Sequence, residues 1–266
     1  MTDVPLTNLD RVLWPRIGFT KGDLVEYYRA VADVLIPHLT NRAVTLWRFP
    51  SGVHERGWWQ NECRGAPSWM TTHGWRGQRF CVVDSVASLL WVANQGTVEL
   101  HPFLHRVGVD RPDYVVFDLD PGPGASIVEC CDVALALRDR VGGVAKTSGG
   151  AGLHVYARAD GRAYEETKAV ARSSAEELAA TRTDVVATQS RESRERRVLI
   201  DWLQNDETRS TVAPYSLRGV EYPTLSTPIT WDEVERCAAE RRPELLMFFA
   251  DDVRVRLEQL GDLFVA

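Results

Sequence analysis

Three aspartates have the type and spacing of metal ligands. Asp118 and Asp120 stand two residues apart at the end of an apolar segment, Tyr114-Val-Val-Phe-Asp-Leu-Asp120, so a strand there places both side chains on one face. Asp201 closes a second apolar segment, Val198-Leu-Ile-Asp201. Carboxylates gathered in this way repel one another and suit a hard cation such as Mg²⁺ or Mn²⁺. The pattern predicts a two-metal site that activates a hydroxyl and stabilises a leaving oxygen; the alternative is a strand end with solvated carboxylates.

Two further segments carry groups that suit phosphate. In Thr147-Ser-Gly-Gly-Ala-Gly-Leu-His154, glycines let backbone N–H groups approach phosphate oxygens, and the candidate contacts are Ser148, Gly149 and His154. Arg218 follows a proline-containing loop, and a guanidinium there suits a triphosphate. Taken singly, the glycine-rich loop also fits a plain hairpin, and a packed histidine and a surface arginine are the more common interpretations of His154 and Arg218.

Hydrophobic periodicity predicts the strands and helices that must position these groups. The predicted helices span 23–39 with Pro37 at its end, 84–94 with Asp84 as N-cap and Gly96 after it, 126–141, 164–180 and 231–241. The predicted strands span 43–47, 80–83, 114–120, 144–147, 153–157 and 197–203. Mixed elements and candidate hairpins predict an α+β fold. Because no linker is evident, we expect residues 1–266 to form a single domain of two packed subdomains.

The five cysteines are odd in number and include no C-x-x-C pair. This pattern predicts buried free thiols in a reducing cytoplasm, not a zinc site or a disulfide framework.

The charge distribution and hydropathy of the sequence limit the classes of partner that it can bind. The net charge is −6, but residues 1–117 carry 12 Lys+Arg against 11 Asp+Glu, whereas the remainder carries 19 against 26. Nucleic acid is therefore expected on the N-terminal half and on a few basic loops. The sequence has no apolar run of membrane-spanning length and no signal peptide near Met1, so we expect a cytoplasmic protein with no membrane partner.

In combination, the motifs resemble the polymerase domain of bacterial ligase D, a member of the archaeo-eukaryotic primase superfamily. The resemblance rests on the order and spacing of Asp118-Leu-Asp-Pro-Gly122, Thr147-Ser-Gly…Gly152-Leu-His154, Leu199-Ile-Asp-Trp202 and Ala213-Pro-Tyr-Ser-Leu-Arg218. It also covers Leu6-Thr-Asn-Leu-Asp-Arg-Val-Leu-Trp-Pro15 and Trp91…Glu99-Leu-His101, and so nearly the whole chain. It implies a primase-type core of mixed and antiparallel sheets with flanking helices.

The resemblance also implies residue roles. Asp118, Asp120 and Asp201 match the ligands of two Mn²⁺ or Mg²⁺ ions. The implied nucleotide contacts are Ser148, Gly149, His154, Arg218, His101 and Arg48. The implied DNA contacts are Arg11 and Lys21, which would hold a 5′-phosphate at a gap or break, and Trp58 and Trp59, which would pack against bases. Exposed adjacent aromatics do suit base stacking, but one core and one surface tryptophan is the alternative.

The implied function is template-directed nucleotidyl transfer from NTP or dNTP to a primer 3′-OH, with terminal addition left open. The resemblance also implies a preference for ribonucleotides and a role in gap filling and end joining on nucleoid DNA. The implied partners are Ku and a separate DNA ligase. The chain departs from the family pattern at three positions, where Trp47, Asn61 and Ala151 stand in place of lysines. Fewer cations put nucleotide affinity in question.

Two rival hypotheses remain from the sequence. A phosphatase of the haloacid dehalogenase class also uses an Asp-x-Asp motif, but Thr or Val normally follows it, whereas Pro121-Gly122 follows here. A DNA-end-binding member of the family that has lost catalysis would explain the missing lysines, although unpaired carboxylates would then be costly.

Overall fold

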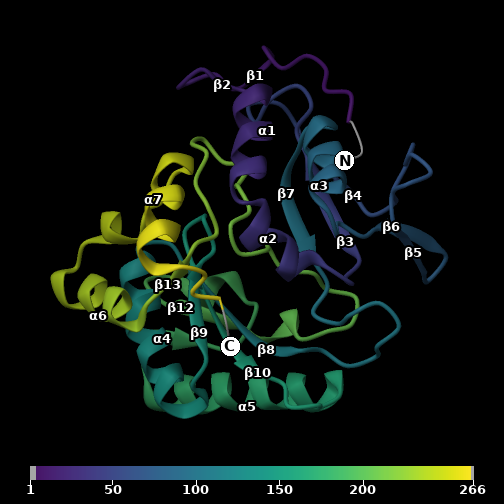
Figure 1. Ribbon diagram of the computed structural model, residues 1–266. Helices are drawn as coiled ribbons and strands as arrows, with labels where there is room; N and C mark the ends of the chain where they lie inside the picture. Colours follow the sequence, from purple (N-terminus) through teal and green to yellow (C-terminus); the bar gives the residue numbers. More distant parts are fainter. Residues whose placement is uncertain (1–3, 265–266) are drawn as a thin grey trace. The chain divides into compact units, whose positions relative to one another are not determined.

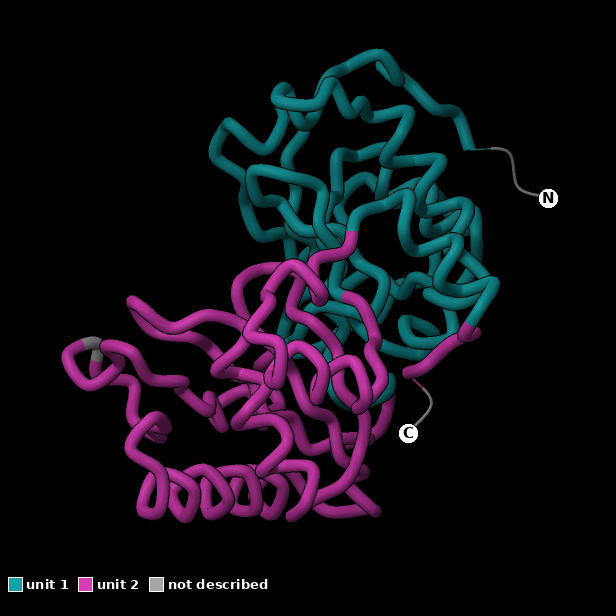
Figure 2. Tube along the Cα trace, turned by 90° about the vertical axis from the view of Figure 1, so that its left-hand side faces the viewer, with its two compact units in different colours: residues 1–107, 210–226, 249–259 teal, residues 108–209, 227–248, 260–266 magenta. Residues whose placement is uncertain are grey.

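The computed structural model describes residues 4–264, which divide into two compact units (Figure 2). Unit 1 contains the described residues up to Val107 together with Ser210–Ser226 and Phe249–Gln259; unit 2 contains Gly108–Arg209, Thr227–Phe248 and the described residues from Leu260 on. Each unit mixes helices with strands, which confirms the predicted α+β class. The single-domain assignment of residues 1–266 stays a prediction.

Unit 2 is built on a six-stranded sheet in the order β11-β12-β8-β10-β9-β13. Neighbouring strands pair antiparallel, except that β11 and β12 are parallel. The strands are β8 Tyr114–Pro121, β9 Val144–Thr147, β10 Leu153–Arg158, β11 Val185–Val186, β12 Val198–Asp201 and β13 Pro228–Ile229.

The two faces of this sheet have opposite character. On β8, the side chains of Val115, Phe117 and Leu119 pack in a core with residues of α4 (Ile127–Val141) and α5 (Tyr164–Thr181), the helices seen below and beside the sheet in Figure 1. Because successive strand residues alternate between faces, Asp118 and Asp120 lie on the face turned away from that core. Helix α6, Trp231–Glu240, packs against α4 and completes the core. Hydrophobic packing thus decides where the carboxylates point.

Unit 1 contains a second sheet, in which β3 pairs antiparallel with β4, β6 and β7. Its strands are β3 Val44–Arg48, β4 Trp58–Gln60, β5 Thr72–Trp75, β6 Gln78–Cys81 and β7 Thr97–Pro102, with a separate pair β1 Val12–Trp14 and β2 Phe19–Thr20. Its helices are α1 Lys21–Ala30, α2 Ala32–Leu39, α3 Val86–Asn94 and α7 Ala250–Leu260. Short 3₁₀ turns in the chain are η1 Arg191–Arg194, η2 Trp202–Gln204 and η3 Pro243–Leu246.

Several predicted boundaries were wrong for identifiable reasons. The single helix expected over 23–39 is two helices separated at Val31, and Pro37 lies inside α2, where it removes only one backbone hydrogen bond. The N-cap of α3 is Ser85, not Asp84, because the Ser85 hydroxyl accepts from the backbone N–H of Ser88 at 3.2 Å.

The strand predicted over 197–203 also ends early, at Asp201. The Asp201 side chain accepts a hydrogen bond from the Leu203 backbone N–H at 3.0 Å and so caps η2.

Within residues 4–264, no helix has both the length and the apolar character needed to cross a bilayer.

The cysteine prediction was wrong for one pair. Cys63 and Cys81 form a disulfide across an 18-residue separation, with Cα atoms 4.8 Å apart. Backbone pairing brings them together, because the Cys63 N–H donates to the carbonyl of Arg79 on β6. Cys130, Cys131 and Cys237 are buried and not disulfide-bonded, as expected.

We predict that thiol titration distinguishes these two classes. The native protein should show almost no reactive thiol, the unfolded non-reduced protein three, and the unfolded reduced protein five. A Cys63→Ser/Cys81→Ser variant should be about 3 kcal/mol less stable to urea than the oxidised wild type, the typical effect of closing a loop of this length. Five thiols in the unfolded non-reduced protein would contradict the disulfide.

Candidate active site

Asp118 lies between two other candidate residues on neighbouring strands. In the backbone register, Asp118 pairs with Asp201 of β12 on one side and with His154 of β10 on the other. Directly paired residues of antiparallel strands project to the same face. Asp120 shares that face by its two-residue spacing. The structure therefore gathers the three predicted carboxylates and the predicted histidine on one face of unit 2.

Each carboxylate contacts protein groups. One Asp118 oxygen lies 3.1 Å from His154 Nε2, and the other accepts from Gln204 Nε2 at 3.3 Å. Asp201 Oδ1 accepts from Gln189 Nε2 at 3.0 Å, in addition to its cap contact. The guanidinium of Arg194 approaches Asp120 to 3.9 Å. The hydrogen bonds hold Asp118 and Asp201 in place, and Arg194 lies within ion-pair distance of Asp120.

The donor set fits a hard divalent cation in type. Burial, followed by the negative charge of Asp118, raises the pKa of Asp201, against the hydrogen bonds from Leu203 and Gln189. A cation would relieve that cost. In the part of the chain that the structure describes, no three His, Cys, Asp or Glu side chains are close enough together to enclose an ion. The two-metal site therefore stays a prediction, supported by register and by donor chemistry.

A buried lysine connects to the carboxylates through His154. Lys146 is fully buried, and its Nζ lies 3.0 Å from His154 Nδ1 and 5.6 Å from the centre of the Tyr156 ring. An ammonium can only donate, so Nδ1 accepts and the other ring nitrogen, Nε2, carries the proton that faces Asp118. His154 is thus held in one orientation beside the carboxylate, and its predicted phosphate contact stays a prediction.

The glycine-rich turn closes on the hydroxyl of Ser148. Ser148 Oγ accepts from the backbone N–H groups of Gly150 at 3.2 Å and Gly152 at 3.1 Å. Gly149 has φ = +72°, a conformation that favours glycine. A Cβ added at Gly152 would lie 2.2 Å from the carbonyl oxygen of Leu119 on β8. The turn is therefore shaped by close backbone approach to β8, and its phosphate contacts stay a prediction.

In unit 1, a second group of predicted residues gathers around a buried carboxylate. Glu99 Oε2 lies 2.8 Å from His101 Nε2 and 3.3 Å from Arg218 Nε, while Oε1 accepts from the backbone N–H of Gly219 at 2.8 Å. We call Glu99, His101 and Arg218 the Glu99 cluster. Burial alone would raise the pKa of Glu99, but the hydrogen bond from His101 and the charge of Arg218 outweigh it, and the pKa is lowered.

The segment that carries Arg218 is pinned to β7. The Ala213 N–H donates to the carbonyl of Leu100 at 2.8 Å, and the Leu100 N–H donates to Ser216 Oγ at 3.0 Å. Tyr215, between them, has φ = +63°, which is costly for a residue with a side chain. Such strain persists only where surrounding contacts enforce it, and it is common at functional sites.

The side chains of both Trp58 and Trp59 are exposed, but they do not form a single surface. Trp58 and Trp59 are each 47% exposed on β4, and as neighbours on a strand they face opposite ways. Trp59 contacts His101 and Trp47, with ring centroids 4.7 and 4.1 Å away. Trp58 lies under the guanidinium of Arg48, 5.5 Å from it. The alternative of one core tryptophan was wrong.

Arg48 and the two N-terminal cations also have protein contacts. Arg48 donates to the carbonyl of Gln95 at 2.9 Å and to Gln60 at 2.5 Å, and burial lowers its pKa. Arg11 donates to the carbonyl of Pro50 at 2.7 Å. The buried Lys21 donates to the carbonyl of Thr7, and burial and then the charge of Arg11 lower its pKa. The charge of Arg11 acts on Lys21, and neighbouring like charges of this kind are relieved by an anion.

Sequence reasoning missed some residues that the structure brings to these sites. Glu99 precedes His101 by two residues on a strand, and this spacing could have indicated a shared face. Lys146 stands beside the glycine-rich turn, where a hairpin would place it opposite His154. Gln189 lies in an irregular segment and Arg194 at the end of the short turn η1, so neither gave a periodic signal.

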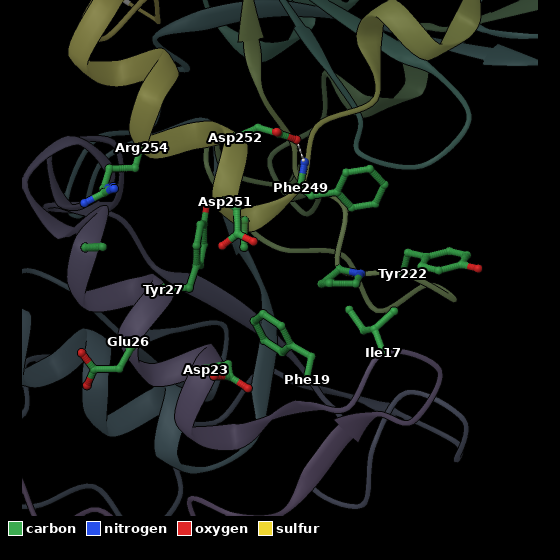
Figure 3. Close-up of a pocket in the computed structure, with 13 residues that line it drawn as sticks. Ile17, Phe19, Asp23, Glu26, Tyr27, Tyr222, Phe249, Asp251, Asp252 and Arg254 are labelled. Atoms are coloured by element: carbon green, nitrogen blue, oxygen red, sulfur yellow. Dashed lines mark hydrogen bonds between the residues drawn. The ribbon is translucent and has the colours of Figure 1, made fainter.

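A hollow lined by described residues of unit 1 has a volume of about 870 Å³ and lies between α1, α7 and the segment around Tyr222 (Figure 3). Two carboxylates of this lining form hydrogen bonds with the backbone. Asp23 accepts a hydrogen bond from the Thr20 N–H at 2.7 Å, and Asp252 accepts one from the Phe249 N–H at 2.8 Å. Its lining contains none of the candidate residues named above.

We predict that Gly152→Ala and Gly150→Ala differ sharply. The first should cost about 1–3 kcal/mol of stability, because its Cβ would collide with β8 beside the carboxylates. A Cβ at Gly150 meets only Ser148 Oγ at 3.5 Å, so this matched control should stay within about 0.5 kcal/mol of wild type. Urea unfolding measures both, and equal stabilities would contradict the close approach at Gly152.

Comparison with known proteins gives one consistent result. A family model described as the LigD primase-polymerase domain matches residues 20–264. The Multifunctional non-homologous end joining protein LigD of Mycolicibacterium smegmatis is 36% identical over 98% of this chain and 35% of its own length. The Bifunctional non-homologous end joining protein LigD of Bacillus subtilis is 30% identical over 96% of this chain and 42% of its own. The chain thus spans well under half of these relatives.

A solved structure agrees over nearly the whole chain. The polymerase domain of Mycobacterium tuberculosis ligase D, in complex with DNA, superimposes with a TM-score of 0.90 at 33% identity. The match covers 98% of this chain and 96% of that one. It confirms the predicted fold and the resemblance from which it was inferred.

Proposed function

The chain belongs to the LigD primase-polymerase domain family, a family of DNA-directed nucleotidyltransferases, and from that premise we propose that it adds nucleotides to the 3′-hydroxyl of a DNA primer under the direction of a template. The observation that carries the proposal is the register of β8, which places Asp118 beside Asp201 and His154 on the face opposite the core. The family match removes the phosphatase alternative.

In this proposal the residues of unit 2 serve the reacting groups. Asp118, Asp120 and Asp201 would hold two Mn²⁺ or Mg²⁺ ions. Such ions would lower the pKa of the 3′-hydroxyl and neutralise charge on the triphosphate. His154, fixed by Lys146, donates toward Asp118 and so orients its carboxylate. The hydroxyl of Ser148 and the backbone of Gly149 would bind phosphate oxygens.

Arg218, His101 and Arg48 of unit 1 are the further proposed nucleotide contacts, and Trp58, Trp59, Arg11 and Lys21 the proposed DNA contacts. The solved relative was captured with DNA, and the curated relatives are named for non-homologous end joining. We therefore propose gap filling at broken bacterial DNA in the nucleoid, with Ku and a separate ligase as partners and with ribonucleotides preferred.

The test is primer extension on a gapped duplex, with Mn²⁺ against Mg²⁺ and NTP against dNTP. We predict that Asp118→Ala and Asp201→Ala each lower the rate by orders of magnitude, because the ions lose a ligand, while circular dichroism stays native. Asp139→Ala, on the exposed surface of α4, is the control and should extend normally. Wild-type rates from the first two variants would refute the assignment; no extension by wild type would favour a DNA-end-binding protein without catalysis.

We predict a further dependence on the 5′-phosphate. Wild type should bind a gap with a 5′-phosphate roughly tenfold more tightly than one with a 5′-hydroxyl, the value of one charge-assisted contact. Salt should shrink this preference. Because the pKa of Lys21 is lowered, alkaline pH should remove its charge, and the preference with it, at a lower pH than for an ordinary lysine.

The matched comparison uses fluorescence anisotropy with Arg11→Ala/Lys21→Ala and with Arg29→Ala, an exposed arginine of α1. The double variant should lose the phosphate preference, and Arg29→Ala should keep it. A double variant that still prefers the phosphate would remove Arg11 and Lys21 from the proposed contact.

A further inference from the structure

Glu99 is a buried carboxylate around which two proposed nucleotide contacts are arranged. Its side chain is 6% exposed, against 9% for His101 and 22% for Arg218. A buried charge is tolerated only where charged or hydrogen-bonding partners compensate its desolvation. Glu99 has three partners around it: the His101 imidazole and the backbone N–H of Gly219 at hydrogen-bond distance, and the Arg218 guanidinium as an ion pair.

The carboxylate determines which nitrogen of His101 carries a proton. The lowered pKa of Glu99 keeps it ionised at neutral pH, and an ionised carboxylate can only accept hydrogen bonds. His101 Nε2, 2.8 Å away, must therefore be the donor. A neutral His101 is then the Nε2–H tautomer, with Nδ1 an acceptor.

The same carboxylate orients Arg218. Arg218 Nε lies 3.3 Å from Glu99 Oε2, an ion-pair contact without hydrogen-bond geometry, and a guanidinium placed by this charge can direct its planar fork of terminal nitrogens at phosphate oxygens. The adjacent N–H of Gly219 binds the other oxygen of Glu99. One carboxylate thus anchors the backbone at Gly219 by a hydrogen bond and the side chain of Arg218 by charge.

We propose that Glu99 is a positioning residue for nucleotide binding, which presets the tautomer of His101 and the orientation of Arg218 before the triphosphate arrives. The proposal rests on the proposed function for its assignment of His101 and Arg218 to the nucleotide. Groups that are ordered in advance need not lose conformational freedom on binding, and affinity rises accordingly. Loss of Glu99 should therefore weaken binding without removing any group that touches the ligand.

A merely structural role predicts a different outcome. If Glu99 only fastens the segment around Arg218 to β7, its loss lowers stability but leaves the affinity of the folded protein unchanged. Two substitutions separate these roles. Glu99→Gln keeps the shape and removes the charge, whereas Glu99→Asp keeps the charge and withdraws it by one methylene.

The first measurement does not depend on nucleotide. Ring ¹⁵N shifts of His101, assigned with His101→Gln, should report the Nε2–H form in wild type. In Glu99→Gln the amide can donate as well as accept, so a mixture of tautomers is expected. An unchanged Nε2–H signal in Glu99→Gln would overturn the preset tautomer, whether or not the protein proves to be a polymerase.

The second measurement is calorimetric binding of a nonhydrolysable α,β-methylene nucleoside triphosphate with Mn²⁺. Glu99→Gln and Glu99→Asp should each bind at least tenfold more weakly than wild type, and the effect should shrink in an Arg218→Ala background because one of the positioned groups is gone. Asp184→Asn, which breaks an ion pair with Arg182 (2.6 Å) in unit 2, is the matched control and should bind normally.

The outcomes separate cleanly. Weaker binding by both Glu99 variants at native thermal stability supports the proposal, as does a KM for nucleotide that rises more than kcat falls. Affinities within twofold of wild type overturn it. Should Glu99→Gln fail to fold, Glu99→Asp decides. Should wild type bind no nucleotide, the proposed function fails, while the tautomer measurement still judges the positioning by Glu99.

Discussion

Antiparallel pairing of β8 with β10 and β12 is the constraint on which the candidate active site depends. It sets Asp118 between His154 and Asp201, and alternation along β8 sends Phe117 and Leu119 into the core. The hydrophobic effect that holds α4 and α5 on one face therefore also holds the carboxylates on the other. Their mutual repulsion is borne by core packing rather than by any contact among themselves.

Both units surround a histidine with buried charge. In unit 2, the ammonium of Lys146 forces His154 to present Nε2–H to Asp118; in unit 1, the carboxylate of Glu99 makes His101 donate through Nε2. An anion and a cation thus fix the same tautomer, because one accepts from Nε2 and the other donates to Nδ1. The tautomer at these two positions is thus set by the neighbouring charge rather than by the histidine itself.

How much could be predicted follows from how local each signal is. The shared face of Asp118 and Asp120 needs only the two-residue period of a strand, and it was predicted; so was the helix over 126–141, whose cap is Ser126. The role of Glu99 could not be predicted in the same way, since its partner Gly219 lies 120 residues away. The Cys63–Cys81 bond likewise needs the pairing near β6. The motif resemblance supplied the fold that local signals could not.

The alternation along β8 makes this segment far less tolerant of changes in length than of changes in composition. Replacing Val115 by another branched apolar residue would alter volume alone. Deleting one residue between Val115 and Asp118 would shift the remainder by one position and turn the carboxylates toward α4 and α5. Among homologues, insertions and deletions should therefore gather in the loops around 108–113 and 188–197, and be purged from β8 itself.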